Sequence, residues 1–228
     1  MMYLLDTADV KKIKKMIEYY PIAGVTTNPT IISNENKEFL KLIKELKKVV
    51  GNRMLHVQVT SSNYEDIIKE AHILKNIVGD NLYVKIPISP DGIKATMELK
   101  KQGFNITETA IFNQQQALIA AIAGADFVAP YVNRLDNTIA DGTNVVKEIV
   151  ELFNLHNINT KVLAASFKNA EQIHKVSMVG GHAVTISPEL LEMLVKSSLT
   201  DAAIEKFNSD WTKVYGNKKI VTLDEKEF

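Results

Sequence analysis

The segment from Asn81 to Gly92 reads NLYVKIPISPDG and has the pattern of a short buried strand that leads directly into a helix. Side chains alternate between the two faces of a strand, so Lys85 lies on the opposite face from Val84 and Ile86. Apolar residues flank the lysine on each side, which indicates that both faces are covered. The side chain of Lys85 must therefore either reach water or lie partly desolvated in a cavity.

These two placements of Lys85 predict different chemistry. A solvated ammonium at the edge of a sheet would be an ordinary surface group, and the segment alone favours this interpretation. A desolvated lysine has a lowered pKa, and its free amine is a nucleophile. The rest of the chain has to decide between them.

One structural unit recurs along the chain: a short β-prone run, a turn, and a longer segment with apolar residues at helical spacing. Strands are predicted near residues 3–5, 22–25, 55–59, 82–86, 105–110, 127–132, 161–165 and 183–186. Helices from the fourth strand onward are predicted at about 90–102, 114–123, 142–154, 169–179, 188–196 and 200–214. Short connections between alternating strands and helices imply parallel strands with right-handed crossovers.

The turns between these elements are chemically polarised. Helix starts carry capping residues, namely Ser62 with Glu65 as a capping box, Ser89 before Pro90, and Ser187 before Pro188. Helix ends carry glycines at positions 51, 79, 103, 124 and 180. About eight such units predict an α/β protein with a (β/α)₈ TIM barrel as a single domain over residues 1–228. The alternative is a doubly wound sheet, which usually has fewer strands, and no G-x-G-x-x-G follows the first strand here.

The composition narrows the range of functions. Acidic and basic residues balance at 27 each, so no nucleic-acid partner is expected. The absence of cysteine excludes disulfides, thiolate metal sites and a cysteine nucleophile. The longest apolar run, 117–125, is too short to span a membrane, and the residues before Asp6 are too few for a secretory signal. We therefore expect a cytoplasmic protein without a membrane partner.

Polar residues lie at the predicted carboxyl ends of nearly all the strands. In chain order they are Asp6, Thr26, Asn28, Gln58, Lys85, Thr109, Tyr131, Arg134, Ser166 and Lys168. In a parallel barrel these ends converge on one mouth. A desolvated lysine beside a carboxylate, a phenol and amides outlines a Schiff-base site. One of only two arginines, Arg134, lies near a helix start with Ser166 and Lys168, a combination that suits a phosphate. The residues thus predict a lysine-dependent enzyme acting on a phosphorylated carbonyl compound.

Several of these residues also have simpler structural interpretations. Asp6 could cap the first helix, and Ser166 could cap the helix that follows it. Asn28 with Pro29 could be an ordinary turn, and Tyr131 could be a buried aromatic residue with a satisfied hydroxyl. His56 fits a core histidine better than a ligand, and without a Cys/His/Asp cluster no metal is expected.

Five motifs occur in order from the first strand to the seventh. They are LDTA at 5–8, AGVTTNP at 23–29, VKIP at 84–87, APYVNR at 129–134 and AASFK at 164–168. Together they resemble the transaldolase family, and specifically its short-chain fructose-6-phosphate aldolase branch. A single motif such as Thr-Thr-Asn-Pro would be modest support, whereas the full set covers essentially the whole chain.

The resemblance implies that Lys85 forms a Schiff base with the substrate ketone and that Asp6 and Asn28 orient the lysine and the substrate hydroxyls. The remaining residues it implicates are Gln58, Thr109 and Tyr131 for the catalytic water and proton transfer, and Thr26, Arg134, Ser166 and Lys168 for substrate and phosphate binding. The resemblance implies no cofactor. It also implies a homo-oligomer, a pentamer or decamer, in which the helix at 200–214 and the tail pack on a neighbouring subunit. The alternative is a helix that covers the surface of its own barrel.

Two positions favour the aldolase branch over the transaldolase branch. Short transaldolases typically carry Glu at the position of Gln58 and Phe at the position of Tyr131. An aldolase must protonate its dihydroxyacetone enamine before release, and a positioned phenol can assist this step. Thr107 and Phe112 depart from the expected apolar residue and tyrosine. We therefore expect cleavage of fructose 6-phosphate to dihydroxyacetone and glyceraldehyde 3-phosphate, with a transaldolase or a catalytically silent sugar-phosphate-binding barrel as alternatives.

Overall fold

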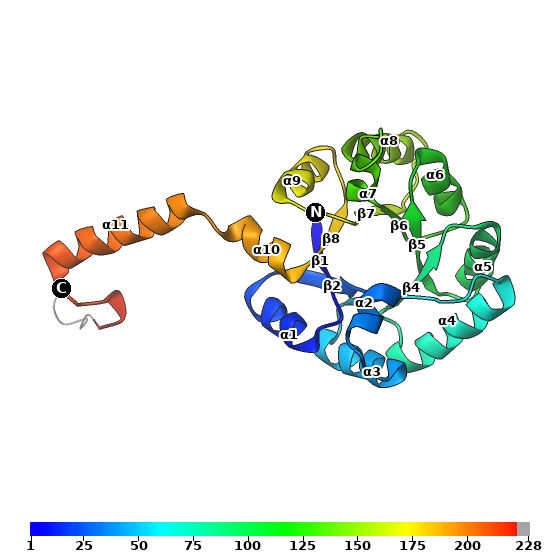
Figure 1. Ribbon diagram of the computed structural model, residues 1–228, viewed down its shortest axis with the longest axis horizontal. Helices are drawn as coiled ribbons and strands as arrows, with labels where there is room; N and C mark the ends of the chain where they lie inside the picture. Colours follow the sequence, from blue (N-terminus) through cyan, green and yellow to red (C-terminus); the bar gives the residue numbers. More distant parts are fainter. Residues whose placement is uncertain (223–228) are drawn as a thin grey trace. The chain divides into compact units, whose positions relative to one another are not determined.

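The computed structural model describes residues 1–222, and its central element is a closed barrel of eight parallel strands (Figure 1). The strands are β1 (Met2–Asp6), β2 (Ile22–Thr26), β3 (Met54–Gln58), β4 (Leu82–Pro87), β5 (Asn105–Ile111), β6 (Phe127–Pro130), β7 (Lys161–Ala164) and β8 (Ala183–Ile186). Each strand pairs with the next along the chain, and β8 closes the barrel against β1. The (β/α)₈ barrel predicted from the sequence is therefore confirmed, and the doubly wound sheet is wrong.

Helices α1 to α9 lie between successive strands along the chain, and α10 follows β8 (Figure 1). They are α1 (Val10–Tyr19), α2 (Pro29–Asn34), α3 (Phe39–Val50), α4 (Tyr64–Val78), α5 (Pro90–Lys101), α6 (Gln114–Ile122), α7 (Val132–Asp136), α8 (Gly142–Leu155), α9 (Ala170–Met178) and α10 (Pro188–Val195). The hydrophobic period of the sequence does not predict α2 and α7, because helices of six and five residues are too short to show one.

The caps agree with the sequence at two helices and differ at a third. Ser89 Oγ accepts a hydrogen bond from the Gly92 amide at 3.0 Å, and Ser187 caps α10 in the same way. The predicted Ser62 cap is wrong, because Asn63 caps α4. Glu70, on α4, accepts hydrogen bonds from the amides and hydroxyls of Thr60 and Ser61 in the loop before the helix. The helix therefore begins one residue later than the sequence predicts.

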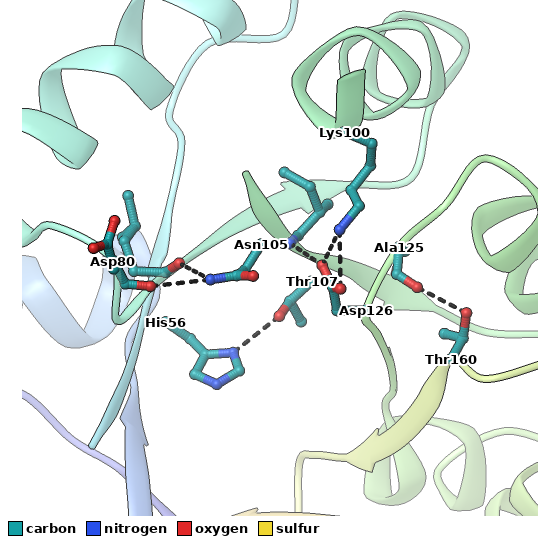
Figure 2. A network of polar contacts seen from close by, with 10 residues as sticks. His56, Asp80, Lys100, Asn105, Thr107, Ala125, Asp126 and Thr160 are labelled. Carbon is teal, nitrogen blue, oxygen red and sulfur yellow. Dashed lines mark hydrogen bonds and ion pairs between the residues drawn. The ribbon is translucent and has the colours of Figure 1, made fainter. Parts of the chain in front are cut away.

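Side chains fill the barrel interior in layers. Near the amino ends of the strands, Leu4, Phe127, Leu163 and Ala183 form a buried cluster. His56 lies in the interior with its ring stacked on Tyr83 at 4.5 Å between centroids, and its Nδ1 is 2.9 Å from the Thr107 hydroxyl (Figure 2). His56 is fully buried, which bears out its interpretation as a core histidine. Because these side chains fill the barrel interior, solvent reaches the barrel only at its two ends.

The amino-terminal end of the barrel is held by polar contacts between neighbouring strands and helices (Figure 2). Asp126 accepts hydrogen bonds from Lys100 Nζ at 2.7 Å and from the Ile106 amide at 2.7 Å, and Thr160 donates to the Ala125 carbonyl. A cavity of about 570 Å³ lies at this end. Asp126, which lines this cavity, forms an ion pair with Lys100, so these contacts have a structural role.

A second compact unit begins at Glu192. Within the described residues it contains the helix α11 (Ser198–Tyr215) and a 3₁₀ turn at Ile220–Thr222. α11 is longer by a few residues than the predicted helix at 200–214, and Ser197 caps it. Residues 223–228 of the tail that is expected to pack on a neighbouring subunit lie outside the described residues.

Candidate active site

A cavity of about 470 Å³ opens where the carboxyl ends of the strands converge, a volume typical of a small-molecule site. Seven of the predicted site residues line it: Asp6, Asn28, Lys85, Tyr131, Arg134, Ser166 and Lys168. They come from five different segments of the chain. The register of the parallel strands is what brings them together, because every strand delivers its carboxyl end to the same mouth.

Lys85 is buried with 5% of its surface exposed, so the solvated placement is wrong. Its Nζ donates a hydrogen bond of 2.8 Å to the Thr27 carbonyl, just beyond the end of β2. Burial lowers the pKa of Lys85, while the charge of Asp6 acts in the opposite direction. The lowered pKa favours the free amine, which is the form that attacks a carbonyl carbon.

Asp6 faces the same cavity from the end of β1. Burial raises the pKa of Asp6, against the opposing effects of the Lys85 charge and a hydrogen bond from Thr26. The Thr26 hydroxyl donates to Asp6 Oδ1 at 2.7 Å. Asp6 does not cap α1, because Asp9 does so by accepting from the amides of the first turn. The Asp6 carboxyl is therefore available to act on a bound molecule.

The two pKa shifts at Lys85 and Asp6 have a common cause and opposite signs. Desolvation disfavours charge on each group, so it moves the lysine toward the amine and the aspartate toward the carboxylic acid. A nucleophile and a proton acceptor with perturbed pKa values in one cavity are the features expected of an acid–base active site.

Tyr131, the residue just before α7, also lines the cavity. Its hydroxyl lies 3.1 Å from Thr109 Oγ1, which places Thr109 behind the phenol and out of the cavity lining. The Phe112 ring contacts the Tyr131 ring edge-on at 5.5 Å, and the Arg134 guanidinium lies over it at 4.8 Å. These contacts fix the position of the Tyr131 ring in the lining of the cavity.

Arg134, Ser166 and Lys168 lie together in the cavity lining, as the phosphate interpretation requires. Ser166 has a φ of 63°, a left-handed backbone conformation that is uncommon for residues other than glycine and occurs at functional sites. Its carbonyl accepts from the Asn133 amide at 2.8 Å. Asn169, rather than Ser166, caps α9, so the Ser166 hydroxyl is not used as a cap.

The two amide residues differ in their placement. Asn28 Oδ1 caps α2 by accepting from the Ile31 amide, and its side chain also lines the main cavity. Gln58 is paired in register with Lys85 on the neighbouring strand. Its side chain lines two smaller cavities, of about 380 and 310 Å³, and not the main one. The expected contact of Gln58 with a catalytic water stays a prediction.

Thr185 is a site residue that the sequence analysis missed. It lies on β8, lines the main cavity, and its hydroxyl is 2.6 Å from that of Thr26. The available signal was weak, because Thr185 is a strand-forming residue and is the only polar residue of a four-residue strand. Thr185 lies near Asp6 because β8 pairs with β1 when the barrel closes.

Within residues 1–222, no group of three or more His, Cys, Asp or Glu side chains is placed to hold a metal ion. Over the same range, every helix is too short or too polar to cross a membrane.

Comparison with known proteins decides the family. The model of the family described as Transaldolase/Fructose-6-phosphate aldolase matches residues 3–226. This chain belongs to the transaldolase/fructose-6-phosphate aldolase family. Within the family it is 38% identical, over 96% of this chain and 100% of the relative, to a Streptococcus pneumoniae protein named "Probable fructose-6-phosphate aldolase". It is also 38% identical, over 93% of this chain and 98% of the relative, to a Thermoanaerobacter protein named "Probable transaldolase".

Among solved structures, a flavocytochrome b2 mutant matches with a TM-score of 0.59 and 11% identity over 82% of this chain. The match covers 56% of the flavocytochrome chain. At this identity it indicates a shared barrel fold alone. Members of the transaldolase/fructose-6-phosphate aldolase family are enzymes that act as aldolases or transaldolases, and the two relatives named above fall on either side of that division.

Proposed function

We propose that this protein is a class I aldolase that reversibly cleaves fructose 6-phosphate to dihydroxyacetone and glyceraldehyde 3-phosphate. The observation that carries the proposal is the buried Lys85 amine, with its lowered pKa, in one cavity with Asp6 and Tyr131. The cationic rim of Arg134 and Lys168 supports a phosphorylated substrate.

The first half of the reaction forms the covalent intermediate. The Lys85 amine attacks the C2 carbonyl carbon, and loss of water leaves an iminium. The iminium then withdraws electrons from the C3–C4 bond. Asp6 takes the proton of the C4 hydroxyl, directly or through a water held near Tyr131, and the bond breaks to release glyceraldehyde 3-phosphate. The electron pair of the broken bond forms the C2=C3 double bond of an enamine, which stays attached to the nitrogen of Lys85.

The second half distinguishes an aldolase from a transaldolase. In an aldolase the enamine is protonated at C3, and hydrolysis of the resulting iminium releases dihydroxyacetone and regenerates the lysine. The Tyr131 hydroxyl, held by Thr109, supports this outcome because it can deliver a proton within the cavity. A transaldolase would instead keep the enamine until a second aldehyde accepts the three-carbon unit.

An assay with and without an acceptor tests the choice of activity. The purified protein is incubated with fructose 6-phosphate alone or together with erythrose 4-phosphate, and free dihydroxyacetone and sedoheptulose 7-phosphate are quantified. We expect dihydroxyacetone without the acceptor. Tyr131→Phe should lower its release by roughly a hundredfold, the usual contribution of a general acid, while transfer to the acceptor falls less. Turnover that depends strictly on erythrose 4-phosphate would make the protein a transaldolase.

The assembly is proposed on the exposed surface of α11. This helix has no buried residue, and its apolar side chains recur at helical spacing: Ile204, Phe207, Trp211, Val214 and Tyr215. Phe207 is 69% exposed and Val214 is 73% exposed. Within its own unit, as far as residue 222, α11 leaves this apolar stripe uncovered, and such a stripe supports packing on a neighbouring subunit, in a pentamer or decamer.

Light scattering tests this assembly. We expect the intact protein to have the mass of five or ten chains, and Phe207→Asp with Val214→Asp to shift it toward single chains while the circular dichroism spectrum is unchanged. A monomeric intact protein would contradict the assembly.

The cytoplasm is the proposed location, which the cysteine-free composition supports because the fold needs no oxidising compartment.

A further inference from the structure

The hydroxyl of Thr185 stands at the end of a hydrogen-bonded chain that leads to Asp6. Thr26 Oγ1 lies 2.7 Å from Asp6 Oδ1 and 2.6 Å from Thr185 Oγ1. Thr26 is fully buried and Thr185 is 3% exposed, so bulk water does not compete for these hydrogen bonds. The three groups come from β1, β2 and β8, which are adjacent strands of the barrel.

The number of protons in the chain determines its direction. A threonine hydroxyl has one proton to donate, and an ionised carboxylate can only accept. When Asp6 is ionised, Thr26 donates to it, so the bond between the two threonines must be donated by Thr185. When Asp6 is protonated, the carboxylic acid can donate to Thr26, which can then donate to Thr185. Asp6 therefore keeps a hydrogen-bond partner in both protonation states.

We propose that Thr185 is a positioning residue that stabilises the ionised form of Asp6 through Thr26. Donation from Thr185 polarises the Thr26 hydroxyl and strengthens its hydrogen bond to the carboxylate. This effect opposes the burial that disfavours the charge of Asp6. The consequence for catalysis rests on the proposed function, in which Asp6 accepts the proton of the C4 hydroxyl and must be ionised beforehand.

The strands next to β1 offer hydroxyl groups, and no charged groups, to stabilise the ionised form of Asp6. Lys85, on β4, is the charged residue that acts on the pKa of Asp6. Arg134 and Lys168 line the same cavity. The strands that flank β1 carry no charged side chain within 22–26 or 183–186, so the threonines are the polar groups these two strands offer to Asp6.

The closing experiment measures the pKa of Asp6 directly, without relying on activity. The protein is labelled with ¹³C at the aspartate carboxyl carbons, the Asp6 signal is assigned by its loss in Asp6→Asn, and the ligand-free protein is titrated by NMR. Thr185→Val removes the hydroxyl at nearly constant shape and should raise the pKa of Asp6 by roughly a few tenths of a unit, because the hydrogen bond from Thr26 remains and loses only the strengthening that Thr185 gives it. Thr185→Ser keeps the hydroxyl and should leave the pKa near that of the unmodified protein.

Thr160→Val is the matched control, because the Thr160 hydroxyl is also buried but donates to the Ala125 carbonyl at the other end of the barrel. It should not change the pKa of Asp6. An unchanged pKa in Thr185→Val, a similar rise in Thr160→Val, or a rise that Thr185→Ser shares would each overturn the proposal.

Kinetics then separate this inference from the proposed function. For fructose 6-phosphate cleavage, Thr185→Val should lower kcat by up to about twofold at pH values below the pKa of Asp6, with little change in KM, and Thr185→Ser should restore it. A shifted pKa in a protein that does not cleave the substrate would overturn the proposed function and leave the hydroxyl chain intact. Cleavage with an unshifted pKa would do the reverse.

Discussion

Replacement of Lys85 with methionine is expected to reduce cleavage of fructose 6-phosphate by a factor on the order of 10⁴ or more, as is usual when a covalent nucleophile is removed. Methionine is unbranched and apolar, so it fills the buried position without a charge. The fold should therefore persist while the reaction loses its electron sink. Initial rates, with a circular dichroism spectrum to confirm folding, measure the effect.

Borohydride trapping gives the same prediction a covalent readout. The intact protein with fructose 6-phosphate and borohydride should gain a reduced substrate adduct that peptide mass spectrometry locates on Lys85, and Lys85→Met should gain none. Lys100→Met is the control, since Lys100 is a partly buried lysine in an ion pair with Asp126 at the opposite end of the barrel. An adduct on any other lysine, or one that persists in Lys85→Met, would refute the mechanism.

The second large effect is a loss of stability as the pH rises, caused by Glu108. This residue follows Thr107 on β5 and points to the opposite face, away from the barrel interior and toward α5. It is fully buried, Thr96 on α5 donates to its Oε1 at 2.6 Å, and its Oε2 has no hydrogen-bond partner within the described structure. Burial raises the pKa of Glu108 from 4.5 to about 7. The folded protein therefore holds Glu108 protonated at mildly acidic pH.

The sign of the effect follows from proton binding. Between pH 4.5 and about 7 the folded protein keeps the Glu108 proton, and the unfolded chain has lost it. The free energy of unfolding must then fall as the pH rises, by about 1.4 kcal/mol per unit, and level off above the folded pKa. Over this window Glu108 should cost about 3 kcal/mol of stability.

Glu108→Gln keeps the shape of the side chain and cannot ionise, so it should flatten this part of the pH dependence. Urea unfolding of both proteins at a series of pH values from 4.5 to 8 measures it as the difference between the two curves. Glu98→Gln is the control: Glu98 lies on α5, and its pKa is lowered by a hydrogen bond from Gln102 rather than raised by burial. Parallel curves for Glu108→Gln and the intact protein would contradict the prediction.

Much of the site could be predicted because a parallel barrel converts sequence position into spatial position. Once a strand is recognised by its apolar run, its last polar residue is assigned to the mouth, whichever strand it is. This reasoning placed Lys85, Asp6, Tyr131 and Arg134 in one cavity before any distance was known. It leaves the placement of Gln58 open, because the register of a residue on a strand does not determine which of several neighbouring cavities its side chain enters.

Capping shows a similar limit. From the sequence, Asp6 is a plausible cap of α1 and Ser166 a plausible cap of α9, whereas Asp9 and Asn169 cap these helices in the structure. The choice depends on the residue at which the helix begins, which is set by packing on the barrel and not by local propensity. In both cases the structure gives the cap to the later residue and leaves the earlier one in the cavity lining.

Eight repeats of strand and helix in the sequence are enough to predict the barrel, and the lysine near the end of a buried strand is enough to propose the chemistry of its mouth. Only the folded chain shows that Lys85 is desolvated, that Thr185 reaches Asp6 through Thr26, and that Glu108 has no partner for its second oxygen among residues 1–222. The reason is physical. Periodicity reports which face of an element is buried, whereas burial of a particular charge and the direction of a hydrogen bond depend on neighbours that are distant in the chain.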